Sequence, residues 1–530
     1  MQTKVSTLFV AVARWMDGSL FFRGLTAILN FIKNICADSF FARAFIADSA
    51  PLDDSVKRSF FANITDKVLN GLPRPITAPE YWNRNLSKLF AGSWLINTFC
   101  EHAGAPIPKP SETAGLELRA IFQWLLFALP AFGIIAVAFA TPFLPTMMLA
   151  GLLLVILFFT LLSRKFVIDG MTVFLLIFIL ISMIAAVTSI VPRSSIQIAL
   201  LTSVFMMSVL AIVACCNSQK TVDLMIKVFV ISAAFTGLVG LWQRVAGLDI
   251  GIWLDQTAFA GEGRIVSTFG NPNVYGTYLL LAIPLAAACI VYVKGVFPKL
   301  CAIGITGLLI INLFLTLSRG CYLSLALAVG IFVLIIEKRL IIPLIPVVAA
   351  LPFILPRAII ARFMSIFNMA DTSTAFRLNI WRGSLRMLQD FWLSGIGQGI
   401  DAYDRVYPFY SLAAIHSPHS HSLYIQYLVE IGVIGFAVFV IVLACYFRTM
   451  ANFLRRTTEF RLRIMTAAMI AAVIGFLFQG VTDFVFYNYR VLLAFYMFIG
   501  IGIAFTRVYA PPPAPKIQEP SLVSNYHEHD

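Results

Sequence analysis

The 530-residue sequence contains little charge, because Asp, Glu, Lys and Arg together make up only 12% of it. A soluble globular chain carries about 25% charged residues. This scarcity excludes a water-soluble enzyme, a disordered chain and a nucleic-acid-binding domain of ordinary composition. The eight cysteines form no Cys-x-x-Cys pair and show no zinc-ligand spacing, so neither a disulfide framework nor a structural zinc site is indicated.

Long apolar runs take the place of the missing charge, and 60% of the residues are hydrophobic. A transmembrane helix needs about 20 mostly apolar residues. The fold class predicted is therefore all-α, a polytopic membrane protein with about twelve transmembrane helices and one large extracytoplasmic helical loop. The predicted spans are 120–140, 143–162, 172–191, 196–216, 222–244, 274–293, 298–317, 321–336, 339–356, 422–446, 463–481 and 490–507.

The basic residues predict the orientation of these spans, since short cytoplasmic loops are enriched in Lys and Arg. The net charge is +13. The short loops on the side of the termini hold most of the loop Lys and Arg, so we expect both termini to be cytoplasmic and the loop 357–421 to be outside. The only Lys or Arg residues in the short connections of the other face are five arginines, Arg193, Arg244, Arg264, Arg319 and Arg490.

The two ends of the chain differ from the membrane domain, which we assign to residues 120–507. In the segment 1–119, charged and apolar residues alternate over 5–47, which favours helices on the inner membrane surface or packed on the bundle. This segment lacks the pattern of a signal peptide, and no role is assigned to it. The proline-rich segment 508–530 is predicted to be a disordered cytoplasmic tail.

Two arginines stand beside predicted spans on the outer face. Arg264 precedes a predicted helix start, where the helix dipole does not favour a cation. It either pairs with Glu262 or lipid phosphate, or belongs to a functional site. Arg319, in Ser318-Arg319-Gly320, has almost no loop to occupy. It could reach the headgroups by snorkelling, but we favour a fixed guanidinium that binds a phosphate bidentately.

The long outer loop holds further polar residues. Its side chains Arg377, Trp381, Arg382 and Arg386 have the spacing of one side of a helix. The following run Gly395-Ile396-Gly397-Gln398-Gly399 lacks a preceding strand and the full dinucleotide fingerprint, so a nucleotide site is not favoured.

The loop ends in three histidines, His416, His419 and His421, just before the span 422–446. They could bind zinc, since imidazole is a common ligand. However, no His-Glu-x-x-His is present and Pro418 prevents a regular helix through the cluster. A purely structural role is a second alternative. We favour one histidine acting as a general base or proton shuttle, which suits its near-neutral pKa.

At these residues the sequence resembles the O-antigen ligase and polysaccharide polymerase family of bacterial envelope enzymes. His421-Ser422 is followed by nine residues and then Gly432-Val433-Ile434-Gly435, as in the ligases of this family. The stretch Arg319-Gly320-Cys321-Tyr322-Leu323 is similar to its Arg-x-x-x-Leu element. Other similar stretches are Ser267-Thr268-Phe269-Gly270-Asn271-Pro272-Asn273, Arg377 with Trp381, and Gly395-Ile396-Gly397. The resemblance covers roughly residues 120–507.

The resemblance implies glycan transfer from a polyprenyl (undecaprenyl) diphosphate donor to an acceptor hydroxyl at the outer face of the bacterial inner membrane. It implies no nucleotide sugar, no cofactor and no metal. Histidine would activate the acceptor, and arginines would hold the diphosphate, where preorganised positive charge stabilises the leaving group. We therefore expect His421, Arg319 and Arg377 to be catalytic. The residues expected to bind substrate are Arg264, His419, Tyr424 and Trp381.

The acceptor stays open at this stage. A ligase would use lipid A-core, a polymerase a lipid-linked glycan, and a protein O-oligosaccharyltransferase a protein hydroxyl; the spaced histidine motif favours the ligase. The expected partners are thus the lipid-linked donor, one of these acceptors and membrane lipids, but no nucleic acid. A solute transporter is the alternative from another class, although transporters place ionisable groups near the bilayer midplane and these spans have almost none. A non-catalytic scaffold would not need the Arg and His residues.

Overall fold

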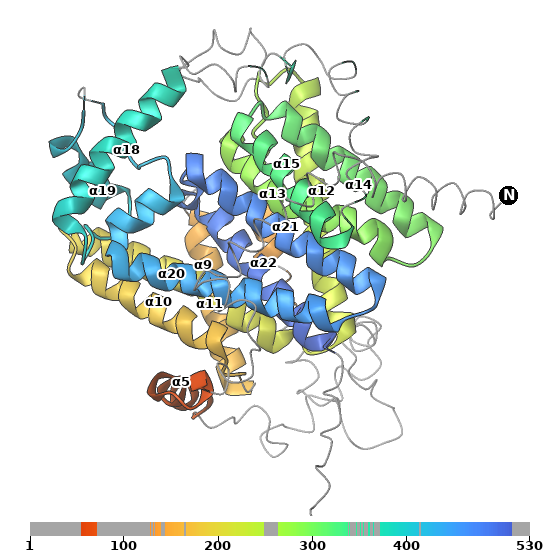
Figure 1. Ribbon diagram of the computed structural model, residues 1–530, viewed down its shortest axis with the longest axis horizontal. Coiled ribbons are helices and arrows are strands. Elements are labelled where there is room, and N and C mark those ends of the chain that lie inside the picture. Colours follow the sequence, from red (N-terminus) through yellow and green to blue (C-terminus); the bar gives the residue numbers. More distant parts are fainter. Residues whose placement is uncertain are drawn as a thin grey trace, which may run out of the picture.

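The computed structural model describes residues 55–71, 144–163, 166–248, 263–337, 372–412 and 415–510, with isolated residues between 128 and 138 and between 339 and 364. These parts of the chain form helices and contain no strand, which confirms the all-α class (Figure 1). Nine of the helices within them are long and apolar enough to cross a membrane.

These nine helices coincide with nine of the predicted spans. They are α10 (Gly170–Val187), α11 (Pro192–Cys215), α12 (Gln219–Val245), α13 (Pro272–Tyr292), α14 (Val296–Leu315), α15 (Arg319–Ile336), α20 (Leu423–Arg456), α21 (Phe460–Thr482) and α22 (Tyr489–Val508).

The other three predicted spans have different outcomes. A further helix, α9 (Leu144–Ser163), forms where the span 143–162 was predicted. The spans 120–140 and 339–356 lie largely outside the described residues, as do 1–54, 72–127 and the tail 511–530. The count of twelve and the course of the outer loop before residue 372 stay predictions.

The spanning helices run alternately between two ends of the bundle. At one end, which we call the basic end, Arg507 pairs with Asp169 at 2.6 Å, and Asp223 accepts hydrogen bonds from Tyr292 and Tyr509. These contacts join the start of α10 and α12 to the ends of α13 and α22. The other end carries His421 at the start of α20 and is called the histidine end.

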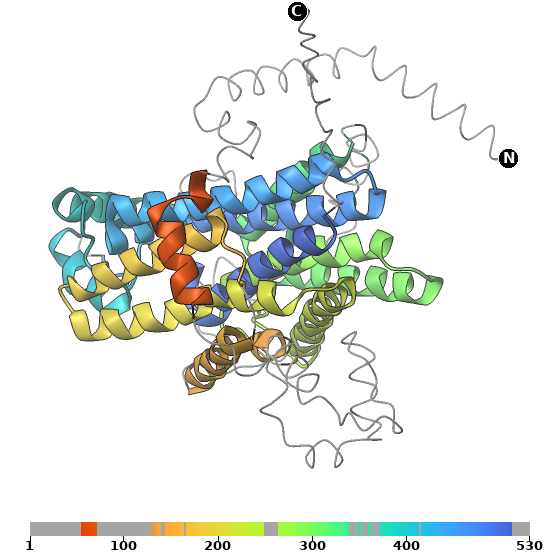
Figure 2. The same cartoon turned by 90° about the horizontal axis from the view of Figure 1, so that it is seen from below.

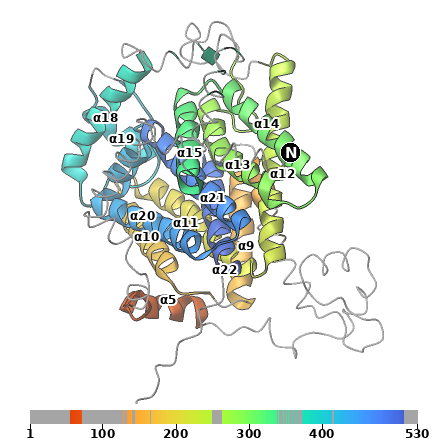
Figure 3. The ribbon, with the colours of Figure 1, turned by 45° about the vertical axis from the view of Figure 1, so that its right-hand side comes forward.

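The centre of the bundle is formed by α13, α21 and α22, whose side chains are mostly buried. In Figure 3, α21 lies between α15 and α13 on one side and α20 and α11 on the other, and α22 packs against α11. Helices associate in lipid through close packing, because lipid offers no hydrophobic drive for their association. Small residues let α21 approach its neighbours closely enough for such packing. Among them are Ala467, Ala468, Ala471, Ala472 and Gly475.

Two helices of the outer loop cover the histidine end. Helix α18 (Thr372–Phe391) includes all four residues predicted to share a helix, Arg377, Trp381, Arg382 and Arg386. Helix α19 (Ile400–Val406) follows it. A second apolar core joins them to α20 and contains Ile380, Met387, Tyr403, Tyr407 and Val429.

The glycine motifs of the loop and of α20 meet each other. Helix α20 unwinds at Gly432, whose φ of 69° is in the left-handed region that favours glycine. The N–H groups of Ile396 and Gly397 donate to the carbonyls of Val429 and Glu430 at 2.8 and 3.1 Å, and Val433 N–H donates to Trp392. A Cβ at residue 432 would collide with the adjoining loop carbonyl. The glycines therefore fix the outer loop to the helix that follows the histidines.

Candidate active site

His421 stands in the turn that leads into α20, and its backbone is held in an unusual conformation. Its φ is 52°, which is uncommon for a residue with a side chain. The turn closes on itself: His421 N–H donates to His419 Nδ1 at 3.2 Å, and Ser420 N–H donates to Gln426 Oε1 at 2.7 Å. Ser420 Oγ also donates to the carbonyl of Ser422. These bonds determine the direction of the His421 ring.

His419 is buried beside His421 and acts as a neutral support. Its ring stacks on Tyr487 of the short helix η7 (Val485–Tyr487), with centroids 5.0 Å apart. Burial lowers the pKa of His419 to about 4, helped by the charges of His421 and Arg377 and opposed by Asp483. Because Nδ1 accepts a hydrogen bond, the ring is neutral with its proton on Nε2.

Asp483 faces His421 from the first position after α21. Its Oδ1 lies 3.7 Å from His421 Nδ1, and its side chain is only 7% exposed against 26% for His421. Burial alone would raise the pKa of Asp483, but His421 with Arg377 and His419 lowers it to about 2. The carboxylate is thus ionised, and the Nδ1 of His421 is directed at it. His421 Nε2 then remains for a substrate proton, as in other carboxylate–histidine pairs.

Asp483 was missed at the level of sequence. One signal pointed to it: the chain has only 26 acidic residues, and this one lies in the connection 482–489 between two apolar spans. An ionisable residue at the edge of a membrane span is a functional candidate by default.

Arg377 comes from α18 and contributes charge to this group. The ring of the preceding residue, Phe376, lies 6.0 Å from the His421 ring. Arg377 is close enough to act electrostatically on both Asp483 and His419. Trp381 stands one turn further along α18, and within the described residues its buried Nε1 has no hydrogen-bond partner. The other two arginines of the predicted helix face, Arg382 and Arg386, are exposed.

Arg319 begins α15 at the same end of the bundle. Its neighbour Gly320 packs against Gln479 and Thr482 in the last turn of α21, directly before Asp483. A Cβ at residue 320 would displace the end of the buried Gln479 side chain, so the small size of glycine suits this close approach. The position of Arg319 is therefore coupled to that of Asp483 through the contact of two helices.

Arg264 is buried and tied to the protein at two atoms. Its Nε donates to the Thr316 carbonyl at 2.7 Å and its Nη2 donates to Asn273 Oδ1 at 2.9 Å. Arg264 and Asp483 both act electrostatically on Cys321, so the three lie in one region. Arg264 thus links the start of α13 to the end of α14. Its alternative partner Glu262 lies outside the described residues.

Tyr424 contributes to helix packing. Its hydroxyl donates to the Leu477 carbonyl of α21 at 2.8 Å, and its ring makes an edge contact with Phe436. These contacts join the first turn of α20 to α21. Its predicted role in an acceptor pocket stays a prediction.

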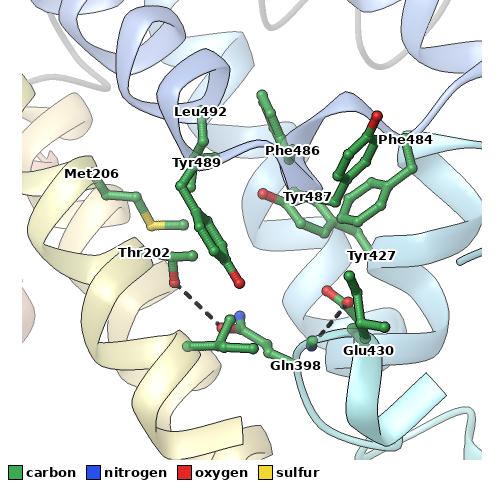
Figure 4. A pocket seen from close by; sticks show the side chains of 13 residues that line it. Thr202, Met206, Gln398, Tyr427, Glu430, Phe484, Phe486, Tyr487, Tyr489 and Leu492 are labelled. Carbon is green, nitrogen blue, oxygen red and sulfur yellow. Dashed lines mark hydrogen bonds between the residues drawn. The ribbon is translucent and has the colours of Figure 1, made fainter. Parts of the chain in front are cut away.

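A pocket adjoins the histidines, behind Tyr487 and Phe484, which both contact His419 (Figure 4). Aromatic and aliphatic side chains form most of its wall. The polar groups are held in place: Thr202 bonds the Gln398 side chain, and Glu430 accepts from Gly399 N–H at 3.1 Å. It is lined by Ile198, Thr202, Met206, Gln398, Gly399, Ile400, Tyr427, Glu430, Phe484, Phe486, Tyr487, Tyr489 and Leu492.

Comparison with protein families gives one match. Residues 304–440 match the family model described as O-antigen ligase. The resemblance to the O-antigen ligase family is confirmed. A search of curated proteins finds no match.

The O-antigen ligase match includes Arg319, Arg377, His421 and the Gly432 motif, and it supports membrane glycan transfer. It ends before Asp483 and begins after Arg264, so the match supports neither residue; Arg264 was predicted from the sequence, and Asp483 enters the site through geometry alone. In the described part of the chain, no three His, Cys, Asp or Glu side chains are grouped as ligands for a metal ion.

Proposed function

We propose that this protein transfers a glycan from an undecaprenyl diphosphate donor to an acceptor hydroxyl on the extracytoplasmic face, as an O-antigen ligase-like enzyme. The observation that carries the proposal is the pair His421–Asp483, with Arg377 acting on the same carboxylate. The pair supplies a base, and the arginines supply charge for a diphosphate.

In the proposed reaction, His421 Nε2 accepts the proton of the acceptor hydroxyl while the oxygen attacks the anomeric carbon. The bond from that carbon to the diphosphate oxygen breaks, and the diphosphate leaves with the electron pair. A single displacement of this kind inverts the anomeric configuration. Asp483 keeps Nδ1 protonated and stabilises the imidazolium that forms, and His419 positions the His421 backbone.

Arginines balance the charge of the leaving diphosphate. Arg377 and Arg319 are proposed to bind its oxygens, because a guanidinium keeps its proton in a site of low dielectric constant. Arg264 is proposed to add positive potential from its fixed position. The buried Nε1 of Trp381 is a hydrogen-bond donor suited to a substrate oxygen. None of these roles requires a metal or another cofactor.

The proposed orientation places the histidine end outside the cytoplasm and both termini inside, in a bacterial inner membrane. It rests on the excess of Lys and Arg in the short loops at the basic end. Such an orientation would bring the pair His421–Asp483 to the membrane rim, where the head of a lipid-linked donor lies.

Lipid A-core is the acceptor we favour, because the spaced histidine motif matches the ligases of the family. The direct test is to incubate the purified protein with a polyprenyl-diphosphate glycan and, separately, lipid A-core, a second lipid-linked glycan or an acceptor peptide. Product mass distinguishes a ligase from a polymerase and from a protein glycosyltransferase. Absence of any product, with glycan moved across a sealed vesicle, would favour the transporter instead.

His421→Ala should abolish transfer while expression and membrane insertion stay normal. His416→Ala is the matched control, since His416 is 73% exposed and pairs with Asp404 on the surface. Transfer at the wild-type rate in His421→Ala would contradict the general-base role.

Arg319→Lys should impair transfer although the charge is kept, because lysine lacks the bidentate fork. The rate and the KM for the donor are the quantities to measure. A normal rate and KM would show that Arg319 only reaches the headgroups.

A further inference from the structure

Helix α5 (Phe60–Asn70) is attached to the basic end of the bundle, beside the start of α10 (Figures 1 and 3). Its first turn is capped by the Ser59 hydroxyl, which accepts from Ala62 N–H. Its last residue, Asn70, makes two hydrogen bonds to the backbone of Phe166, at 2.8 and 3.0 Å. Phe166 lies shortly before Gly170, where α10 begins. Helix α5 is therefore held at the level where a spanning helix ends; seen from below in Figure 2, it lies across the bundle.

The surface of α5 divides into three faces. The first is buried against the protein and consists of Ala62, Thr65 and Leu69. The second is polar and consists of Asn63, Asp66, Lys67 and Asn70. The third is apolar but exposed and consists of Phe60, Phe61, Ile64 and Val68. At about 100° per residue, the centres of these faces are about 120° apart.

The exposed apolar face has no protein cover among the described residues. Phe60 is 72% exposed and Val68 is 59% exposed, although both belong to a continuous stripe. A contiguous apolar surface of this kind marks a site of interaction. Helix α5 has 11 residues, too few to cross a bilayer, for which about 20 are needed.

We propose that the third face of α5 lies in the boundary between headgroups and acyl chains of the bilayer leaflet at the basic end, and that it binds anionic phospholipid. A helix at this boundary contacts protein on one side, lipid on another and water on the third. The buried, the exposed apolar and the polar face of α5 suit these three surroundings in that order. Within the described residues 55–71, Lys57, Arg58 and Lys67 outnumber the single acid Asp66, and this local excess complements anionic headgroups. The hydrogen bond from Asn70 to Phe166 holds α5 at the depth in the bilayer where α10 begins.

A fluorescent amino acid incorporated at Ile64 tests the proposal in the full-length protein. Asn63 is the matched control position, because it is the preceding residue and belongs to the polar face. The protein is placed in nanodiscs of phosphatidylcholine and phosphatidylglycerol with brominated acyl chains. We expect bromine to quench the probe at 64 several-fold more than the probe at 63, and acrylamide in the water to quench the probe at 63 more strongly.

Equal quenching at the two positions would overturn the proposal. Protection of the probe at 64 from both quenchers would also overturn it and would indicate a protein partner or a second copy. The double substitution Lys57→Gln and Arg58→Gln should reduce the part of the quenching that depends on phosphatidylglycerol. If quenching in the parent protein does not depend on phosphatidylglycerol, the anionic-lipid assignment is wrong. These outcomes do not depend on glycan transfer.

Discussion

Substitution of Asp483 by Asn tests the role that geometry alone gave to this residue. Asn has nearly the same shape but no charge, so it removes the electrostatic support of His421 and little else. At 3.7 Å between Asp483 Oδ1 and His421 Nδ1, and an effective dielectric constant of about 20, opposite charges attract by about 4 kcal/mol. This attraction is absent while His421 is neutral and develops as His421 takes the acceptor proton.

Loss of the full attraction would slow transfer by about 10³-fold, since about 1.4 kcal/mol corresponds to a factor of ten. Two effects reduce this value. Proton transfer is incomplete in the transition state, and the His421 side chain is 26% exposed, so water screens part of the interaction. We therefore expect kcat to fall about 100- to 1,000-fold in Asp483→Asn.

The assay is single-turnover transfer from a polyprenyl-diphosphate glycan, with product mass as the readout. Asp404→Asn is the matched control, because its carboxylate also faces a histidine, His416 at 3.3 Å, but both side chains are exposed. Exposed pairs of this kind contribute little, so this variant should keep its rate. An Asp483→Asn protein that is folded and transfers glycan at nearly the wild-type rate would refute the proposed support of His421 by Asp483.

The lowered pKa values of the two groups beside His421 predict how stability depends on pH. Burial lowers the pKa of His419 to about 4, and the charges of His421, Arg377 and His419 lower the pKa of Asp483 to about 2. The melting temperature should be highest above the ordinary histidine pKa of about 6.5. It should fall towards pH 4, because the unfolded chain takes up a proton that the buried His419 resists. It should fall again below about pH 3.8, because the unfolded chain protonates Asp483 before the folded protein does. Gly432→Ala should lower the melting temperature, because alanine at a φ of 69° costs about 1–2 kcal/mol before the collision with the loop is counted. Gly330→Ala, at a helical position of α15 where an added Cβ meets no atom within 4 Å, is its control and should be milder; equal melting temperatures in the two variants would contradict the proposed contact.

Local pattern was sufficient to predict the nine described spanning helices and α18, but not α5 or α19. The apolar runs predicted the nine described spans, and the spacing of Arg377 and Trp381 predicted α18. The match over residues 304–440 confirmed the resemblance to the O-antigen ligase family that the histidine motif indicated. Each of these features depends on residues close together in sequence, and helix periodicity relates such residues directly.

The partners across helices could not be predicted in this way. Asp483 faces His421 only because α21 packs beside α20, and apolar helices do not reveal their neighbours by composition. The bonds of Arg264 to Thr316 and Asn273 are of the same kind. The glycines at 395–399 were noted in the sequence, but their contact with the unwound turn at Gly432 depends on three-dimensional packing.

The proposed base and the proposed cation are positioned by contacts outside the site. His421 precedes α20 and Arg377 belongs to α18, and the two helices are joined by backbone bonds between the loop after α18 and the unwound turn at Gly432. Apolar packing of Ile380 against Val429 strengthens the same joint. The spacing of base and cation is therefore set before substrate binds, which is the condition for preorganised catalysis. Because these contacts use backbone and apolar groups, the imidazole Nε2 of His421 need not hold the site together and can act on the acceptor hydroxyl.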